Sequence, residues 1–132
     1  MRFETKAIHA GAEVDVATGA VSPPLYLSTT FERDLQGGTP RGYSYVRDAN
    51  PTQHRLEEAL AAIDSGEGAL AFASGMSAAS ALLQSLPNRA SAGAHVLFPD
   101  DSYYAIRSIA GEYFPHWGAS SDFIAMEDLD GV

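Results

Sequence analysis

The sequence predicts an α/β fold with a mainly parallel sheet, because short apolar runs alternate with segments of helical spacing. Three runs have the length and character of buried strands, at residues 69–73, 94–98 and 122–126. The helical patterns between them suit the right-handed crossovers that join parallel strands. With 132 residues and 45% hydrophobic content, the chain is long enough to form a core of its own.

The composition limits the classes of partner. The chain has 17 acidic and 8 basic residues, a net charge of -9, so it lacks the basic patch that nucleic acid or anionic membranes require. It has no cysteine, no transmembrane-length apolar run and no signal-peptide pattern, which favours a cytoplasmic protein that binds small molecules or other proteins. The four histidines are scattered, so we expect neither a metal site nor a hydrolase.

Residues 1–48 are rich in threonine, serine, proline and glycine and show no sustained helix or strand period. We expect an extended arm with turns at residues 18–19, 23–24 and 37–38 and short strand character at residues 25–31. An irregular segment of this length cannot satisfy its own backbone polar groups well. The arm is therefore expected to lie on a partner subunit.

A well-defined helix is expected to begin after Asn50. Asparagine is a preferred N-cap, Pro51 suits the first helical position, and Gln53 can reach back to the cap. Apolar residues follow at helical spacing over residues 56–63, and Gly66 is expected to end the helix.

The apolar run at residues 69–73 leads directly into Ser74, Gly75 and an alanine-rich helical pattern that is expected to end before Pro87. In such a strand–turn–helix arrangement the free N–H groups of the helix N-terminus, including that of Met76, point outward and can bind a phosphate. Glycine at this turn lets a ligand approach the backbone closely. Taken alone, the same residues are also compatible with a plain helix cap.

Two other groups of residues can bind a ligand. Tyr45 and Arg47, at i and i+2 in an expected extended segment, project from the same side and can close on one phosphate. Tyr103 follows the run at residues 94–98 and begins a helix expected over residues 103–113, where it can stack on a planar ligand. Each also has a plain alternative, a solvated arginine beside a packed tyrosine and a tyrosine packed on its own helix.

Together these segments resemble the N-terminal third of the Cys/Met metabolism (transsulfuration) family of pyridoxal-phosphate enzymes, which includes cystathionine γ-synthase, cystathionine γ-lyase and methionine γ-lyase. The resemblance covers nearly the whole chain. Residues 5–11, 18–21 and 24–31 resemble the family's N-terminal arm, residues 45–52 its Tyr-x-Arg-x-x-Asn-Pro-Thr motif, and residues 72–76 its phosphate turn.

The resemblance implies an aspartate-aminotransferase-type (fold type I) architecture. Residues 1–48 would be the intersubunit arm of a homodimer or homotetramer, and residues 49–132 an incomplete cofactor-binding α/β domain. The implied cofactor is pyridoxal 5'-phosphate, and the implied substrate is a small amino acid.

The resemblance also assigns roles to single residues. The turn formed by Ser74, Gly75 and Met76 would bind the cofactor phosphate through its backbone N–H groups, and Tyr45 and Arg47 would reach that phosphate from a neighbouring subunit. The residue Tyr103 would stack on the pyridine ring and assist proton transfer as a catalytic residue. The family usually continues this tyrosine with Gly-Gly-Thr, whereas this chain continues with Tyr-Ala-Ile.

In the family, the Schiff-base lysine and the aspartate that pairs with the pyridine nitrogen are expected beyond the point where this chain ends. The only lysine here, Lys6, lies in the arm and is not expected to substitute. The intact enzyme would catalyse β- or γ-elimination or γ-replacement on cystathionine, methionine or activated homoserine. This chain alone, as a fragment, a truncated gene product or one piece of a split protein, is expected to be inactive. The alternatives are a non-catalytic dimerisation or interaction module and a generic phosphate-binding α/β domain.

Overall fold

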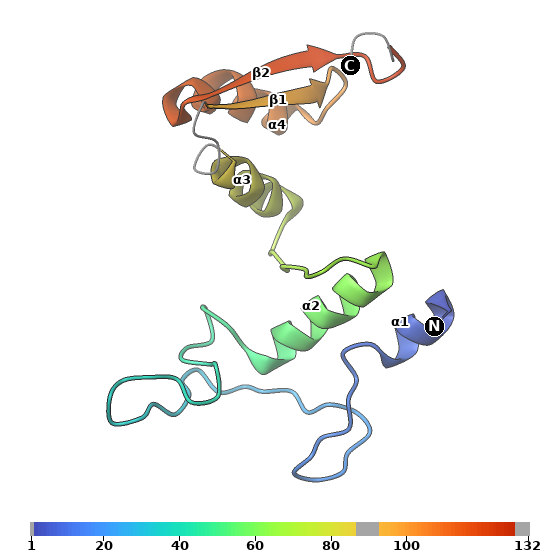
Figure 1. Cartoon of the computed structure of the whole chain (residues 1–132), viewed down its shortest axis with the longest axis vertical. Coiled ribbons are helices and arrows are strands. Elements are labelled where there is room, and N and C mark those ends of the chain that lie inside the picture. The colour runs from blue at the N-terminus through green and yellow to red at the C-terminus, as the bar shows by residue number, and fades with distance from the viewer. Residues whose placement is uncertain (1, 87–92, 129–132) are drawn as a thin grey trace. The chain divides into compact units, whose positions relative to one another are not determined.

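The computed structural model describes residues 2–86 and 93–128 and divides the chain into an N-terminal unit, Met1–Ala71, and a C-terminal unit, Phe72–Val132. Figure 1 shows the elements of both units. The N-terminal unit contains helices α1 (Phe3–His9) and α2 (Pro51–Asp64). The C-terminal unit contains α3 (Gly75–Ser85), β1 (Ala94–Pro99), α4 (Tyr104–Ser108), the π-helix η2 (Ile109–Tyr113), the 3-10 helix η3 (Phe114–Trp117) and β2 (Ala119–Ile124).

The two strands β1 and β2 form a parallel pair, with Ala94 opposite Ala119 and Pro99 opposite Ile124. Parallel strands require a crossover, which α4, η2 and η3 supply. The strands predicted from the runs at residues 94–98 and 122–126 are therefore confirmed, although β2 begins earlier and ends earlier than its apolar run.

The core of the C-terminal unit lies between the parallel pair, α3 and the crossover. Its buried residues are Leu83, Phe98, Ala110, Phe114 and Ala119, and Phe114 is completely buried. The rings of Phe98 and Phe114 are 5.8 Å apart between centroids. Because Leu83 belongs to α3, this core holds that helix against the parallel pair.

The predicted start of α2 is confirmed. Asn50 is the N-cap, its Oδ1 accepts the N–H of Thr52 at 2.8 Å, and Pro51 takes the first helical position. The side chain of Gln53 does not reach back to the cap as predicted. It donates to Oε1 of Glu57 at 2.9 Å, the i,i+4 partner on the same helix face.

The end of α2 differs from the prediction by one residue. Ser65, rather than Gly66, takes the left-handed conformation, with φ of 57°. The Oγ of Ser65 accepts a hydrogen bond from Nζ of Lys6 at 3.0 Å. This bond ties the end of α2 to α1 and compensates the unfavourable backbone conformation of a non-glycine residue.

The prediction that residues 1–48 lack helix is wrong for α1. This helix has seven residues and no side-chain cap, and it packs along α2. A helix this short is marginal without tertiary contacts, so its own sequence does not indicate it. The turns expected at residues 18–19 and 37–38 are confirmed by Gly19 and Gly37, whose φ angles are 72° and 82°. The turn expected at residues 23–24 is wrong, since the chain has no turn there.

The strand character expected at residues 25–31 gives a single bridge between Thr30 and Tyr45 rather than a strand. The buried strand predicted at residues 69–73 is also wrong, and Leu70 there is 75% exposed. No strand within residues 2–86 or 93–128 pairs with this segment. The N–H of Ala71 instead donates to a carboxylate oxygen of α2.

The helix predicted over residues 103–113 forms with three successive geometries, because regular α-helix ends at Ser108 and continues as η2 and η3. It does not stop before Pro115, which lies in the first turn of η3, where its missing N–H costs nothing. Gly118, with φ of 72°, ends the helical segment. The stop predicted at Pro87 lies outside the described residues, and α3 ends at Ser85.

Candidate phosphate and ligand site

The N-terminus of α3 is organised by Ser74. This residue has extended backbone, and its Oγ accepts the N–H of Ser77 at 3.1 Å while its carbonyl accepts the N–H of Ala78 at 3.1 Å. The bond to Ala78 is the first intrahelical bond, and the bond to Ser77 satisfies one N–H group that a helix start otherwise leaves unpaired. The N–H groups of Gly75 and Met76 belong to the same first turn.

The amides of Gly75 and Met76 have no acceptor among the residues that the structure describes. A Cβ built on Gly75 would meet nothing within 4 Å, so the space beside this residue is open. The first turn of α3 carries no acidic residue. Free N–H donors at a helix N-terminus without a competing carboxylate fit the phosphate of pyridoxal phosphate.

Tyr45 and Arg47 lie close together in the N-terminal unit, with the guanidinium carbon 4.5 Å from the centroid of the phenol ring. The extended segment predicted for them is wrong, since Tyr45 accepts the N–H groups of Asp48 and Ala49 and so begins a turn. The guanidinium therefore lies over the face of the Tyr45 ring, whereas the two side chains were expected to project side by side from an extended segment. Arg47 is exposed, and no carboxylate in the described part of the chain pairs with it.

Tyr103 lies just beyond the carboxyl end of β1, as predicted, and is the N-cap residue of α4. Its side chain is 56% exposed, and its ring lies 4.6 Å from that of Tyr104 between centroids. A hydrogen bond with Tyr104 raises the pKa of the Tyr103 phenol. The phenol therefore keeps its proton at neutral pH. Tyr104, which replaces a glycine of the family pattern, thus contacts the predicted stacking residue directly.

The predicted site residues fall into two groups. Ser74, Gly75 and Met76 form one continuous turn, and Tyr103 belongs to the same C-terminal unit. Tyr45 and Arg47 form a contacting pair in the N-terminal unit.

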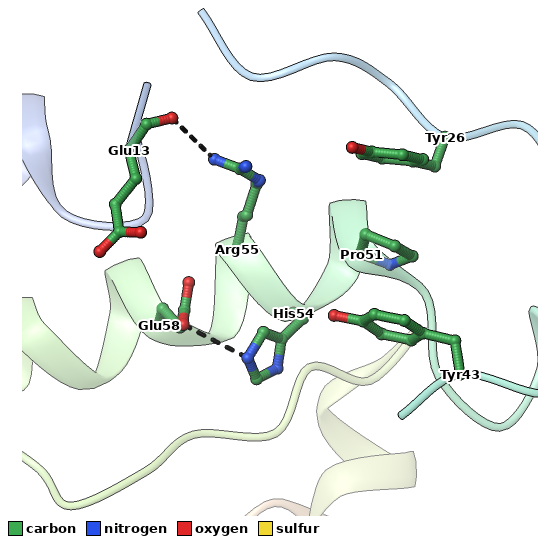
Figure 2. Close-up of a pocket in the computed structure, with 7 residues that line it drawn as sticks. All are labelled: Glu13, Tyr26, Tyr43, Pro51, His54, Arg55 and Glu58. Carbon is green, nitrogen blue, oxygen red and sulfur yellow. Dashed lines mark hydrogen bonds and ion pairs between the residues drawn. The ribbon is translucent and has the colours of Figure 1, made fainter. Parts of the chain in front are cut away.

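Sequence reasoning missed a pocket of about 190 Å³ between the arm and α2 in the N-terminal unit (Figure 2). Its residues come from segments far apart in the sequence, so no local motif indicates it. The lining residues are Glu13, Tyr26, Tyr43, Pro51, His54, Arg55 and Glu58.

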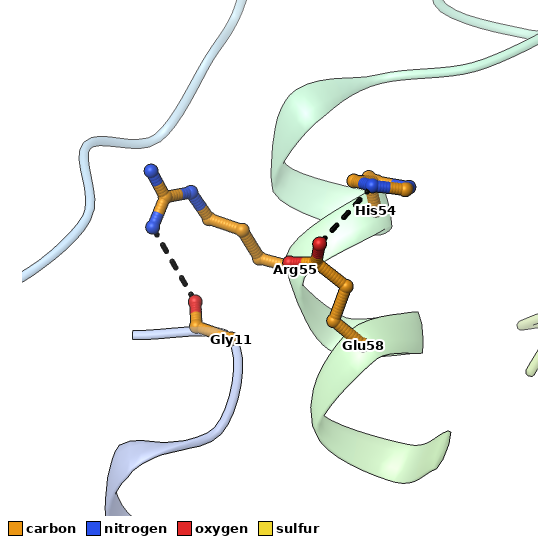
Figure 3. Close-up of polar contacts among 4 residues, drawn as sticks. All are labelled: Gly11, His54, Arg55 and Glu58. Atoms are coloured by element: carbon orange, nitrogen blue, oxygen red, sulfur yellow. Dashed lines mark hydrogen bonds and ion pairs between the residues drawn. The ribbon is translucent and has the colours of Figure 1, made fainter. Parts of the chain in front are cut away.

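Three charged or titratable side chains of this pocket make polar contacts. Nη1 of Arg55 donates to the backbone carbonyls of Glu13 at 3.2 Å and of Gly11 at 3.4 Å, and the latter contact is visible in Figure 3. Nε2 of His54 lies 3.3 Å from a carboxylate oxygen of Glu58 on the same helix. The two Arg55 contacts fasten the arm to α2.

Among the described residues, no group of three or more histidine, cysteine, aspartate or glutamate side chains is arranged to hold a metal ion. Within the same residues, no helix combines the length and apolar character needed to span a bilayer.

The sequence matches the family described as "Cys/Met metabolism PLP-dependent enzyme" over residues 4–132. It is 41% identical to cystathionine gamma-synthase of Mycobacterium tuberculosis over 128 residues, which is 97% of this chain and 32% of the relative. It is 35% identical to cystathionine beta-lyase of Lactococcus lactis over 130 residues, 98% of this chain and 33% of the relative. The chain thus spans about a third of the length of these curated relatives.

Solved structures agree with the sequence matches. The metB structure from Corynebacterium glutamicum aligns with a TM-score of 0.84 at 30% identity, covering 99% of this chain and 33% of that one. Cystathionine gamma-lyase from Lactobacillus plantarum aligns with a TM-score of 0.77 at 32% identity, covering 98% and 32%. The expected fold type I α/β architecture is confirmed. The chain therefore belongs to the Cys/Met metabolism family of pyridoxal-phosphate-dependent enzymes and corresponds to its N-terminal portion.

Proposed function

We propose that this chain is the phosphate-binding N-terminal part of an enzyme that eliminates or replaces a β- or γ-substituent of cystathionine, methionine or activated homoserine. The names of its relatives, cystathionine gamma-synthase and cystathionine beta-lyase, support this reaction class. The observation that carries the proposal is the pair of unpartnered amides of Gly75 and Met76 in a chain of this family.

The chain's own residues would hold the anionic end of the cofactor. Gly75 and Met76 donate their N–H groups to the phosphate, while Ser74 keeps the turn in shape through its two bonds into α3. Tyr45 and Arg47 supply a phenol and a guanidinium to the phosphate bound by a neighbouring copy. Pyridoxal phosphate, when bound, supplies an electron-withdrawing ring that stabilises negative charge on the substrate.

Tyr103 would have two tasks beside this phosphate site. Its exposed ring offers one face to a planar ligand, since Tyr104 occupies only one side of it. A phenol is protonated at neutral pH, so the hydroxyl of Tyr103 has a proton that it can donate to a leaving group.

We expect the 132-residue polypeptide by itself to show no turnover. Its only lysine is Lys6, in α1, and the Nζ of that residue is engaged by the Oγ of Ser65 at the end of α2. The chemistry of the family needs an amine that reacts with the cofactor's aldehyde. The amine of Lys6 lies in the arm of the N-terminal unit and already makes a hydrogen bond there. The chain would therefore contribute binding without the covalent step.

The proposal is tested by comparing the affinity of the chain for pyridoxal phosphate with that for pyridoxal, which lacks the phosphate, in equilibrium dialysis. We expect the phosphate to increase the affinity. In Gly75→Pro the N–H donor is lost at the first helical position, where proline fits because Ser74 is extended. One hydrogen bond to a charged group contributes about 1.5–3 kcal/mol, so pyridoxal phosphate should bind roughly tenfold or more weakly.

The helix should survive this substitution, because a Cβ at position 75 meets nothing within 4 Å. Circular dichroism checks this point, and pyridoxal affinity should not change. Arg47→Ala should also weaken the binding of pyridoxal phosphate if copies exchange this side chain. Equal affinities for the two compounds in the native chain would contradict the proposal.

A second role, assembly through the arm, is favoured by the exposure of its apolar side chains. Val16 and Leu35 are fully exposed and Leu27 is 89% exposed. Large apolar side chains left in water in one segment are typical of a surface covered by a partner. We infer that the arm mediates a homodimer or homotetramer, a role that a non-catalytic interaction module would share.

A further inference from the structure

We propose that Asn50 and Thr52 are positioning residues that clamp the arm at Tyr26 and thereby hold the loop that carries Tyr45 and Arg47 in its observed shape. The ligand relevance of that loop rests on the proposed function. The clamp itself rests on contacts within the N-terminal unit.

The clamp holds both backbone groups of one arm residue. Nδ2 of Asn50 donates to the carbonyl of Tyr26 at 3.1 Å, and the N–H of Tyr26 donates to Oγ1 of Thr52 at 2.9 Å. Asn50 is 7% exposed and is the buried polar residue of the described chain. Since its Oδ1 caps α2 as well, the donor and the acceptor of this amide serve two different purposes. One oxygen starts the helix and one NH₂ group fixes the arm.

A second fastening lies a few residues along the arm. The N–H of Phe31 donates to the carbonyl of Ser44 at 3.1 Å, and the N–H of Val46 donates to the carbonyl of Thr29 at 2.9 Å. These bonds flank the bridge opposite Tyr45. The arm is thus tied to the loop before α2 at one end and to α2 itself at the other.

The contacts at Tyr26 and at the Thr30–Tyr45 bridge hold the arm on both sides of the loop. The rings of Phe31 and Tyr43 lie 5.4 Å apart, and Tyr43 and Tyr26 line the same pocket with Pro51 (Figure 2). The loop of residues 43–49 is therefore held at its beginning by the arm and at its end by the start of α2. If the arm is released at Tyr26, the two backbone bonds of the Thr30–Tyr45 bridge and the ring contact of Phe31 with Tyr43 remain to hold the loop to the arm.

The side chains that the loop presents depend on this closure. The guanidinium of Arg47 lies 4.5 Å from the centroid of the Tyr45 ring. Among the described residues, no carboxylate forms an ion pair with it. The position of Arg47 thus follows that of Tyr45, and the position of Tyr45 follows the bridge to the arm.

Three variants of the full 132-residue chain separate the clamp from the helix cap. Asn50→Asp keeps an oxygen that caps α2 but loses the NH₂ donor to the carbonyl of Tyr26. Thr52→Val removes the hydroxyl that accepts the Tyr26 amide, with little change of shape. Thr52→Ser keeps the hydroxyl and is the matched control.

Two measurements read the loop without any cofactor. Amide exchange of Phe31 and Val46, which neither substituted residue touches, should be at least tenfold faster in Asn50→Asp and Thr52→Val and near native in Thr52→Ser. The δ-methylene signals of Arg47, displaced by the ring current of Tyr45, should move toward random-coil positions in the first two variants only. The amides in the middle of α2 serve as the folding control.

Unchanged exchange at Phe31 and Val46, or an unchanged Arg47 signal, would overturn the positioning role. Loss of protection throughout α2 would also overturn it, since both substitutions are chosen to keep the cap. Pyridoxal phosphate affinity is measured in the same variants. If the native chain binds pyridoxal phosphate no better than pyridoxal, the proposed function fails, whereas the exchange and ring-current results decide the clamp independently.

Discussion

At the scale of single residues, Gly11 is the position where the arm permits no side chain. Its φ is +67°, and a Cβ would collide with the backbone carbonyl oxygen of Arg55 in α2. The carbonyl of Gly11 also accepts Nη1 of Arg55 at 3.4 Å (Figure 3). We expect Gly11→Ala to destabilise the N-terminal unit by about 2 kcal/mol or more, measured by urea unfolding.

Gly19→Ala is the control, since Gly19 also has a positive φ, of +72°, but a Cβ at this position would meet nothing within 4 Å. It should cost only the left-handed conformation, about 1–2 kcal/mol. If the two substitutions destabilise equally, the collision with Arg55 has no energetic consequence and close packing of the arm on α2 is wrong.

At the scale of elements, the success of the sequence predictions depends on whether a contact is local. The start of α2 was predictable because Asn50 and Pro51 act within one helical turn. The helix α1 was not predictable, because it is stabilised by packing on α2. Its Lys6 forms a hydrogen bond with Ser65, which is 59 residues away in the sequence. The apolar run at residues 69–73 is typical of a strand, but a strand also needs a neighbouring strand to pair with, and composition does not indicate whether one is present.

The Glu57 carboxylate links α2 to the segment that was predicted as a strand. Its Oε1 accepts the N–H of Ala71 at 2.9 Å, and this bond, followed by that from Gln53, lowers the pKa of Glu57. The link therefore contributes stability above the ordinary value of 4.5 and is lost as the pH falls through the lowered pKa. We expect the amide signal of Ala71 to titrate with a midpoint below 4.5, and this titration to vanish in Glu57→Gln.

A midpoint at or above the ordinary glutamate value would show that the Ala71 amide does not stabilise the carboxylate. The pH range of the measurement extends from neutrality to about pH 3, where an unperturbed carboxyl is already mostly protonated.

At the scale of the whole molecule, the start of α3 was predictable and the geometry of the loop that carries Tyr45 and Arg47 was not. Ser74 and Gly75 act within one turn of the helix, so these two residues and the helical pattern after them were sufficient. Tyr45 and Arg47 were predicted to project from the same side of an extended segment, whereas a turn places the guanidinium of Arg47 over the ring of Tyr45. The fastening of that turn uses Tyr26, which no local spacing relates to it.

The exposed apolar side chains of the arm lead to a prediction about assembly. Leu27 and Leu35 are 89% and 100% exposed, and burying each at an interface is worth about 1.5–3 kcal/mol. We expect the native chain to self-associate in sedimentation velocity as its concentration rises, and the double variant Leu27→Ser, Leu35→Ser to shift this association to higher concentration. Leu82→Ser, at a 62% exposed position in α3, is the control and should associate like the native chain. A native chain that stays monomeric at every concentration would exclude the arm as an interface.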